Sequence, residues 1–341
     1  DSGFTMSLHH KPGMSYHKEG QSIFKIAFES LFDSRNMNEF RRDLRNKISV
    51  TKWGFYMLDQ SGSVMCTDID GPSMNFEAFN LNESSPLIFT NIPLQKDPAG
   101  FEHFITFSQT REIWLKEKLE RKKNMHTLDA LTDVKDQKTR KWTHPAATLS
   151  TVGAIQFNLK LGVIHVKEGT GALTASDSII EFSLADQSPG KILKKEETAT
   201  PFEYAWKKAS AAQSYYDQGQ WDLAYHNLQM AEALMPHPIW KEIFKFYIGV
   251  WNFKFISNKR ELAQIYRDIK KLSPPESLKD QWVFLCMRFE KKLGLVLTFN
   301  ETHVSGYLRN QFKLEIEASL PVFNTWMKLL YPRIEILDVF S

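Results

Sequence analysis

Two consecutive helical patterns within residues 204–238 constrain the fold more than any other stretch of this chain. Apolar residues recur every three to four positions in both, the period of an α-helix with one buried face. A break at residues 217–220 contains a glycine and separates the two patterns. Small side chains let two helices approach closely at Ala212, Ala224 and Ala231. The stretch therefore predicts an antiparallel helical hairpin.

The small, aromatic, turn and stop residues of this hairpin have a recognisable spacing. They are Ala212, Tyr215, Gly219, Trp221, Ala224, Ala231 and Pro236. In this spacing the hairpin resembles a tetratricopeptide (TPR) repeat. Less regular helical patterns follow over residues 243–272, 278–293, 304–318 and 322–331. The resemblance implies an all-α TPR-like domain over residues 203–341, in which stacked helical pairs bind a protein or peptide partner on a concave surface.

The helix surfaces of this domain supply the candidate partner-binding residues. They are Lys207, Lys208, Gln213, Tyr216, His226, Asn227 and Tyr247. Some TPR domains hold the C-terminal carboxylate of a chaperone with a Lys/Asn clamp on the first helix of a repeat. Ala209 and Gln213 stand at the clamp positions here, so the resemblance does not extend to that ligand.

The first half of the chain predicts a mixed α+β domain over residues 21–185. Helical patterns cover residues 22–32 and 37–48, and an apolar hairpin with a glycine turn follows at 53–70. Alternating apolar side chains predict two more strands, over residues 151–166 and 178–184. Together with short strands near residues 88 and 104, these are expected to form one antiparallel sheet. The helix pair and its hairpin resemble PAS- and GAF-type sensor domains, which implies small-molecule binding as one alternative function.

Asp68 and Asp70 are the candidate metal ligands. Two carboxylates one residue apart at a strand end can share a divalent cation. Some nucleotide-sugar glycosyltransferases use a DxD motif in this way, so a metal-dependent transferase is a second alternative. A solvated turn without a metal explains the same two residues. An EF-hand loop is excluded, because the glycine and the later ligands lie at the wrong offsets.

Polar segments delimit the two domains. Residues 1–20 predict a mobile N-terminal tail, residues 186–202 an interdomain linker, and residues 124–148 a loop or linker. Ten Lys or Arg and six Asp or Glu lie between Arg111 and Lys141, which is a weak basic stretch. The net charge of the whole chain is only +3, so nucleic acid is not an expected partner.

Composition and the two cysteines indicate in which cellular compartment the protein is found. No run of about 18 apolar residues occurs, so no transmembrane helix is predicted. Cys66 and Cys286 are predicted to be buried free thiols, which favours a reducing, cytoplasmic environment. Glycosylation sequons at Asn82 and Asn300 leave a secretory-pathway alternative open.

The motifs together favour binding over catalysis. The sequence contains no Gly-rich phosphate loop, no cluster with metal-ligand spacing and no local nucleophile signature, and no cofactor is expected. We therefore expect a non-enzymatic adaptor or scaffold that binds a protein or peptide partner as part of a multiprotein complex. The transferase and the small-molecule sensor remain the alternatives.

Overall fold

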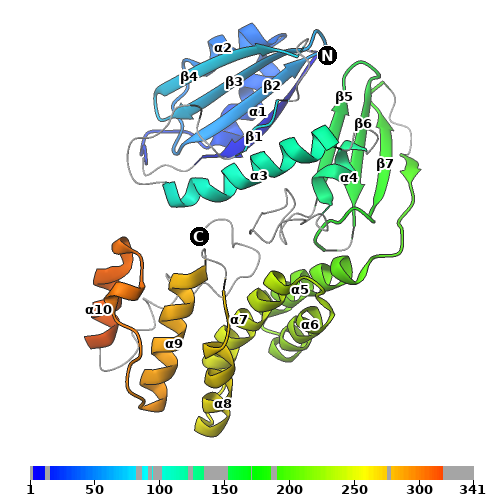
Figure 1. Cartoon of the computed structure of the whole chain (residues 1–341). Helices are drawn as coiled ribbons and strands as arrows, with labels where there is room; N and C mark the ends of the chain where they lie inside the picture. Colours follow the sequence, from blue (N-terminus) through cyan, green and yellow to red (C-terminus); the bar gives the residue numbers. More distant parts are fainter. Residues whose placement is uncertain are drawn as a thin grey trace.

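The structure is a computed structural model of the whole chain. It describes residues 3–11, 16–81, 87–90, 94, 102–121, 126–133, 153–169, 171–185, 190–274 and 278–317. Figure 1 shows a first sheet with two helices on one side, a second sheet beside it, and a helical region that forms the other end of the molecule. The predicted class, α+β with an antiparallel N-terminal part followed by a helical region, is confirmed.

The first sheet is an antiparallel meander in the order β1-β2-β3-β4. Its strands are β1 Phe4–His10, β2 Trp53–Asp59, β3 Ser63–Asp70 and β4 Ser73–Asn80. The predicted hairpin is β2 and β3, with Gly62 at a positive φ in the turn. Helices α1 (Ile23–Asp33) and α2 (Met37–Leu44) cover one face, where Ile26, Phe40 and Phe55 are fully buried.

Three expectations for this region were wrong, and the first is the short strand near residue 88, because the described residues 87–90 form no strand. Residues 4–10 are strand β1, paired with β2 from Phe4 opposite Asp59 onward, so this part of the predicted tail belongs to the sheet. The predicted strand near residue 104 is instead the start of helix α3 (Glu102–Arg121). A short apolar run fits either structure, and here the helical pattern that follows it continues through the run.

The second sheet is separate from the first and has the order β5-β6-β7-β8. Its strands are β5 Ala154–Asn158, β6 Val163–Glu168, β7 Ser178–Ser183 and β8 Lys191–Lys194. The expectation of a single sheet was therefore wrong. Strand β8 also occupies part of the predicted linker at 186–202, and the short helix α4 (Thr127–Thr132) lies within the predicted loop at 124–148.

The helical region begins with the predicted hairpin, α5 (Pro201–Asp217) and α6 (Trp221–Leu234). Helices α7, α8, α9 and α10 follow, over Pro238–Phe255, Lys259–Lys270, Lys279–Leu293 and Arg309–Glu317. Gly219 and Gly294 have positive φ angles of 74° and 72°, which lets the chain turn after α5 and end α9. The predicted helix at 322–331 lies outside the described residues.

One large core holds helices α5 to α9 together. Trp206, Trp251, Phe244 and Phe289 are almost fully buried in it, and Ala172 from the loop between β6 and β7 joins the same cluster. The loop between β6 and β7 is thus packed against the helices. Among the helices of the described ranges, none has both the length and the apolar composition that crossing a bilayer requires.

Candidate functional site

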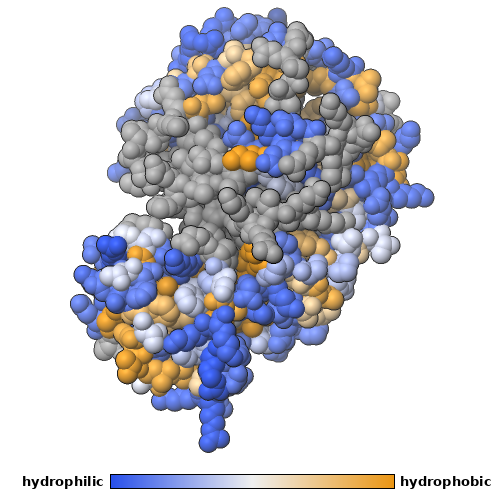
Figure 2. Space-filling model, in the orientation of Figure 1, coloured by the Kyte–Doolittle hydropathy of each residue, from blue (hydrophilic) through white to orange (hydrophobic). Residues whose placement is uncertain are grey.

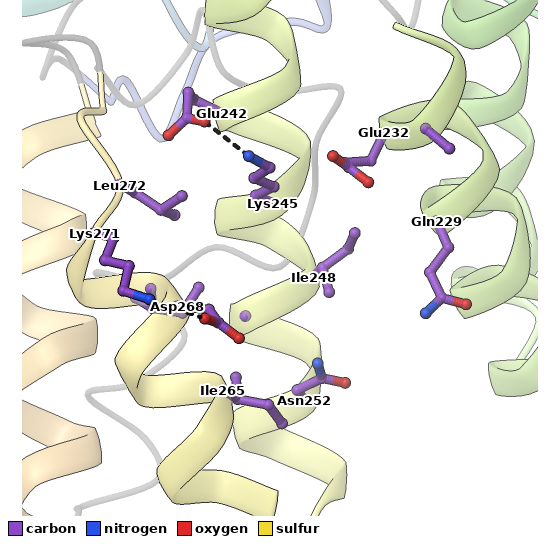
Figure 3. Close-up of a pocket in the computed structure, with 13 residues that line it drawn as sticks. Gln229, Glu232, Glu242, Lys245, Ile248, Asn252, Ile265, Asp268, Lys271 and Leu272 are labelled. Atoms are coloured by element: carbon purple, nitrogen blue, oxygen red, sulfur yellow. Dashed lines mark hydrogen bonds and ion pairs between the residues drawn. The ribbon is translucent and has the colours of Figure 1, made fainter.

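An open groove of about 650 Å³ lies between α6, α7 and α8 (Figure 3). Its residues recur at helical spacing, because one face of each helix borders it. Helix α6 contributes Gln229, Glu232 and Ala233, and α7 contributes Glu242, Lys245, Ile248, Gly249 and Asn252. Helix α8 and the residues after it contribute Ile265, Asp268, Ile269, Lys271 and Leu272.

The floor of the groove is apolar and closely packed. A Cβ atom on Gly249 would lie 2.2 Å from Cδ1 of Ile269, so the glycine allows α8 to approach α7 at this point. Ile248 and Ile265 are half-buried beside it. Apolar side chains that are partly exposed in a concavity offer area that a ligand can remove from water.

The rim of the groove carries charges of both signs. Lys245 donates to Glu242 over 3.1 Å, and Lys271 lies 3.8 Å from Asp268. Glu232, on the opposite rim, pairs with Lys241 at 3.7 Å. These pairs are partly exposed, so each stabilises the fold little and its charges remain within reach of a ligand. The groove therefore combines an apolar floor with a rim that carries charges of both signs.

The seven residues predicted to bind a partner do not line the groove. Gln213, Tyr216, Asn227 and Tyr247 are all buried in the helical region, where Tyr216 stacks on Trp251 with ring centroids 4.9 Å apart. Buried side chains cannot present a binding surface, so the proposal below does not use them. The amphipathic patterns of α7 and α8, with Gly249 inside an apolar helix, were the signal that could have located the site.

The three predicted lysine and histidine contacts lie elsewhere on the helices. Lys207 forms an ion pair of 2.5 Å with the buried carboxylate of Asp177 and so joins α5 to the second sheet. Lys208 packs over the ring of Tyr204. His226 is exposed on α6.

The two candidate metal ligands have separate partners. Asp68 is buried and accepts a hydrogen bond of 2.6 Å from the backbone N–H of Leu94, and burial raises the pKa of its carboxyl. Asp70 is partly exposed and lies 3.4 Å from Nε2 of His17. Within the part of the chain that the structure describes, no group of three or more His, Cys, Asp or Glu side chains is placed to hold a metal.

The second face of the first sheet is filled by packed side chains. Tyr56 stacks on Phe89 at 4.5 Å between ring centroids, in a cluster that includes Cys66. The Lys11 ammonium group is buried against Tyr56 and donates to the carbonyl of Thr90 over 2.9 Å. Burial lowers the pKa of Lys11 to about 8. A lysine with this pKa can act as a nucleophile, but here its side chain is enclosed and holds a loop onto the sheet.

Both cysteines are free and buried, as predicted. Burial is the main cause that raises the pKa of each thiol to about 12, and carboxylates nearby act in the same direction. A thiol in such surroundings is a poor nucleophile.

Comparison with known proteins does not add to this description. No protein-family model matches the chain, and neither a curated protein nor a solved structure matches it. The groove is therefore interpreted from its own residues and geometry.

Proposed function

We propose that this protein is a non-enzymatic scaffold that holds a peptide segment of a partner protein in the groove between α6, α7 and α8. The observation that carries the proposal is the groove itself, whose apolar floor is bordered by partly exposed charges of both signs. Such a surface can bind a segment that alternates apolar and polar residues.

Two further observations support binding rather than catalysis. The rigid core under the groove, with Trp251 and Phe244 almost fully buried, preorganises the floor and lowers the entropic cost of binding. The antiparallel helical pairs also fit the TPR resemblance of the sequence, and known TPR arrays bind peptides. The protein then acts as part of a multiprotein complex, in which the two sheets position the helical region relative to the other subunits.

The test compares partner recovery by the intact chain and by variants of the groove floor. We expect Ile248→Lys to reduce recovery of its partner at least tenfold, because a lysine side chain there removes apolar area and adds a charge. The matched control is Val296→Lys, because Val296 is 90% exposed outside the groove. Equal recovery by both variants, with unchanged unfolding temperatures, would show that the partner binds elsewhere.

A further inference from the structure

The second sheet has one face made almost entirely of apolar side chains. The register places Ile155 opposite Val166, and Phe157 opposite Ile164. Across the next pairs, Ile164 faces Phe182, Val166 faces Ile180, and Ile180 faces Ile192. Directly opposed residues of antiparallel strands point to the same side. The apolar face is thus formed by Ile155, Phe157, Ile164, Val166, Ile180, Phe182 and Ile192.

This apolar face is open to solvent. Ile155 and Ile192 are 58% and 59% exposed, and Phe157 is 41% exposed. In the described part of the chain, none of its seven residues belongs to an apolar core cluster. In Figure 2, apolar atoms reach the surface at the right-hand edge of the molecule, the side on which Figure 1 draws this sheet.

The opposite face of the same sheet is mostly polar and points into the protein, with Ile179 as a fully buried apolar residue on it. His165 contacts His126, while Lys167 and Lys194 both pair with Asp129, and both partners come from α4 or the residue that precedes it. The sheet is therefore patterned in reverse, with its polar face packed and its apolar face exposed. An antiparallel sheet ordinarily packs its apolar face, so an open apolar face of this size marks an interaction surface.

The dimensions of the face decide what fits it. Four strands spaced about 4.8 Å apart, each of about five residues, present roughly 330 Å². A stable interface buries about 800 Å² on each partner, so a second copy held by this face alone falls well short. An α-helix of 11 residues is about 16 Å long and about 10 Å wide, which matches the strands. The first sheet is covered by a helix of this length, α1 with 11 residues.

We propose that the apolar face docks an amphipathic α-helix of a partner protein. Charge at the two ends of the face gives the helix a direction. Glu168 continues the same side of β6 and is exposed, and Lys160 is exposed in the turn at the other end. A docked helix complements both ends when acidic residues in its first turn lie near Lys160 and basic residues in its last turn lie near Glu168. The dipole of any helix also favours acidic residues in the first turn and basic residues in the last.

The test uses the full chain with isoleucine methyl groups labelled for NMR. The probe is a 14-residue synthetic amphipathic peptide with a leucine face, two Glu at its start and two Lys at its end. A peptide of the same composition in scrambled order is the control. We expect the probe alone to shift the methyl signals of Ile155, Ile164, Ile180 and Ile192. The groove methyls of Ile248, Ile265 and Ile269 should not move.

Variants locate the contact and separate it from loss of folding. Phe157→Ser with Phe182→Ser should weaken binding of the probe at least tenfold, whereas Phe28→Ser, at an exposed aromatic on α1, should leave it unchanged. Unfolding temperatures of all variants are measured alongside. Shifts confined to the groove methyls would overturn the proposal. So would a concentration-dependent dimer that Phe157→Ser abolishes, since a second copy would then cover the face.

Discussion

At the scale of single residues, a chain of hydrogen bonds through two histidines joins α4 to the second sheet. The backbone N–H of Leu128 donates to Nδ1 of His126 over 3.2 Å. The proton of a neutral His126 ring therefore lies on Nε2, which contacts Nδ1 of His165 at 3.1 Å. His165 then donates from Nε2 to Glu181 over 3.0 Å. This order of donors requires both rings to be neutral.

We predict that the free energy of unfolding decreases as the pH falls below about 6.5, in part through His126. Burial, followed by the nearby His165, lowers the pKa of His126 in the folded chain. The unfolded chain then binds more protons below its own pKa, so acid favours unfolding. The other groups that face the ring are Asp129, Lys167 and Lys194. Urea unfolding at pH 7, 6 and 5 measures the effect.

The matched variants for this experiment are His126→Asn and His226→Asn. Asparagine at position 126 keeps an acceptor for the N–H of Leu128 and removes the titrating group, so stability should depend less on pH than in the native chain. His226 is exposed, and its replacement should leave the dependence unchanged. An identical pH dependence in all three proteins would contradict the proposed role of His126.

At the scale of elements, helices were predicted well and several strands were not. The α5–α6 hairpin follows from its own periodicity and glycine turn, which are local signals. Strand β4 (Ser73–Asn80) was not predicted, although Met74, Phe76 and Ala78 alternate with polar residues, and it pairs with β3 along its whole length. The groove was not predictable from the first hairpin, where most of the predicted partner-binding residues lie, because it forms only when α6, α7 and α8 pack together.

The contact between α7 and α8 gives a prediction at this scale. Gly249→Ala adds a Cβ that would lie 2.2 Å from Cδ1 of Ile269. Overpacking lowers the free energy of unfolding by about 1–3 kcal/mol, and the better helix propensity of alanine offsets at most about 1 kcal/mol of this loss. We expect a net loss of about 1 kcal/mol in the free energy of unfolding, measured by urea denaturation.

A second substitution tests whether the clash with Ile269 causes this loss of stability. Ile269→Val removes the Cδ1 atom that the new methyl group meets. The double variant should therefore be less destabilised than the sum of the two single variants, by about 0.5 kcal/mol or more. Simple additivity would mean that the two side chains do not compete for the same space.

At the scale of the whole molecule, buried charges join the second sheet to the helical region. The carboxylate of Asp177 accepts from Lys207 of α5 and from the backbone N–H of Thr174, at 2.5 and 2.6 Å. Glu203 of α5 is buried and accepts from the backbone N–H of Ser176 over 3.2 Å. This arrangement was not predictable, since Asp177 and Ser176 lie 30 and 27 residues before their partners on α5.

We predict that Lys207→Met destabilises the chain by about 3 kcal/mol, because it leaves the Asp177 carboxylate buried without its cation. Residues 171–200 should then become more sensitive to proteolysis. The control is Lys208→Met, whose side chain packs over Tyr204 and should cost less than about 1 kcal/mol. Equal effects of the two substitutions would show that the ion pair does not hold the junction.

The central claim, that the groove holds a peptide of a partner protein, is tested most directly by photo-cross-linking in the source cells. A photoreactive amino acid replaces Lys245 on the groove rim or, as the matched control, Lys25 on α1, where the side chain is 58% exposed. The proposal predicts a defined protein adduct from position 245 that is absent from position 25, with the cross-linked site in one short segment of the partner. The same adducts from both positions, or none from position 245, would contradict it.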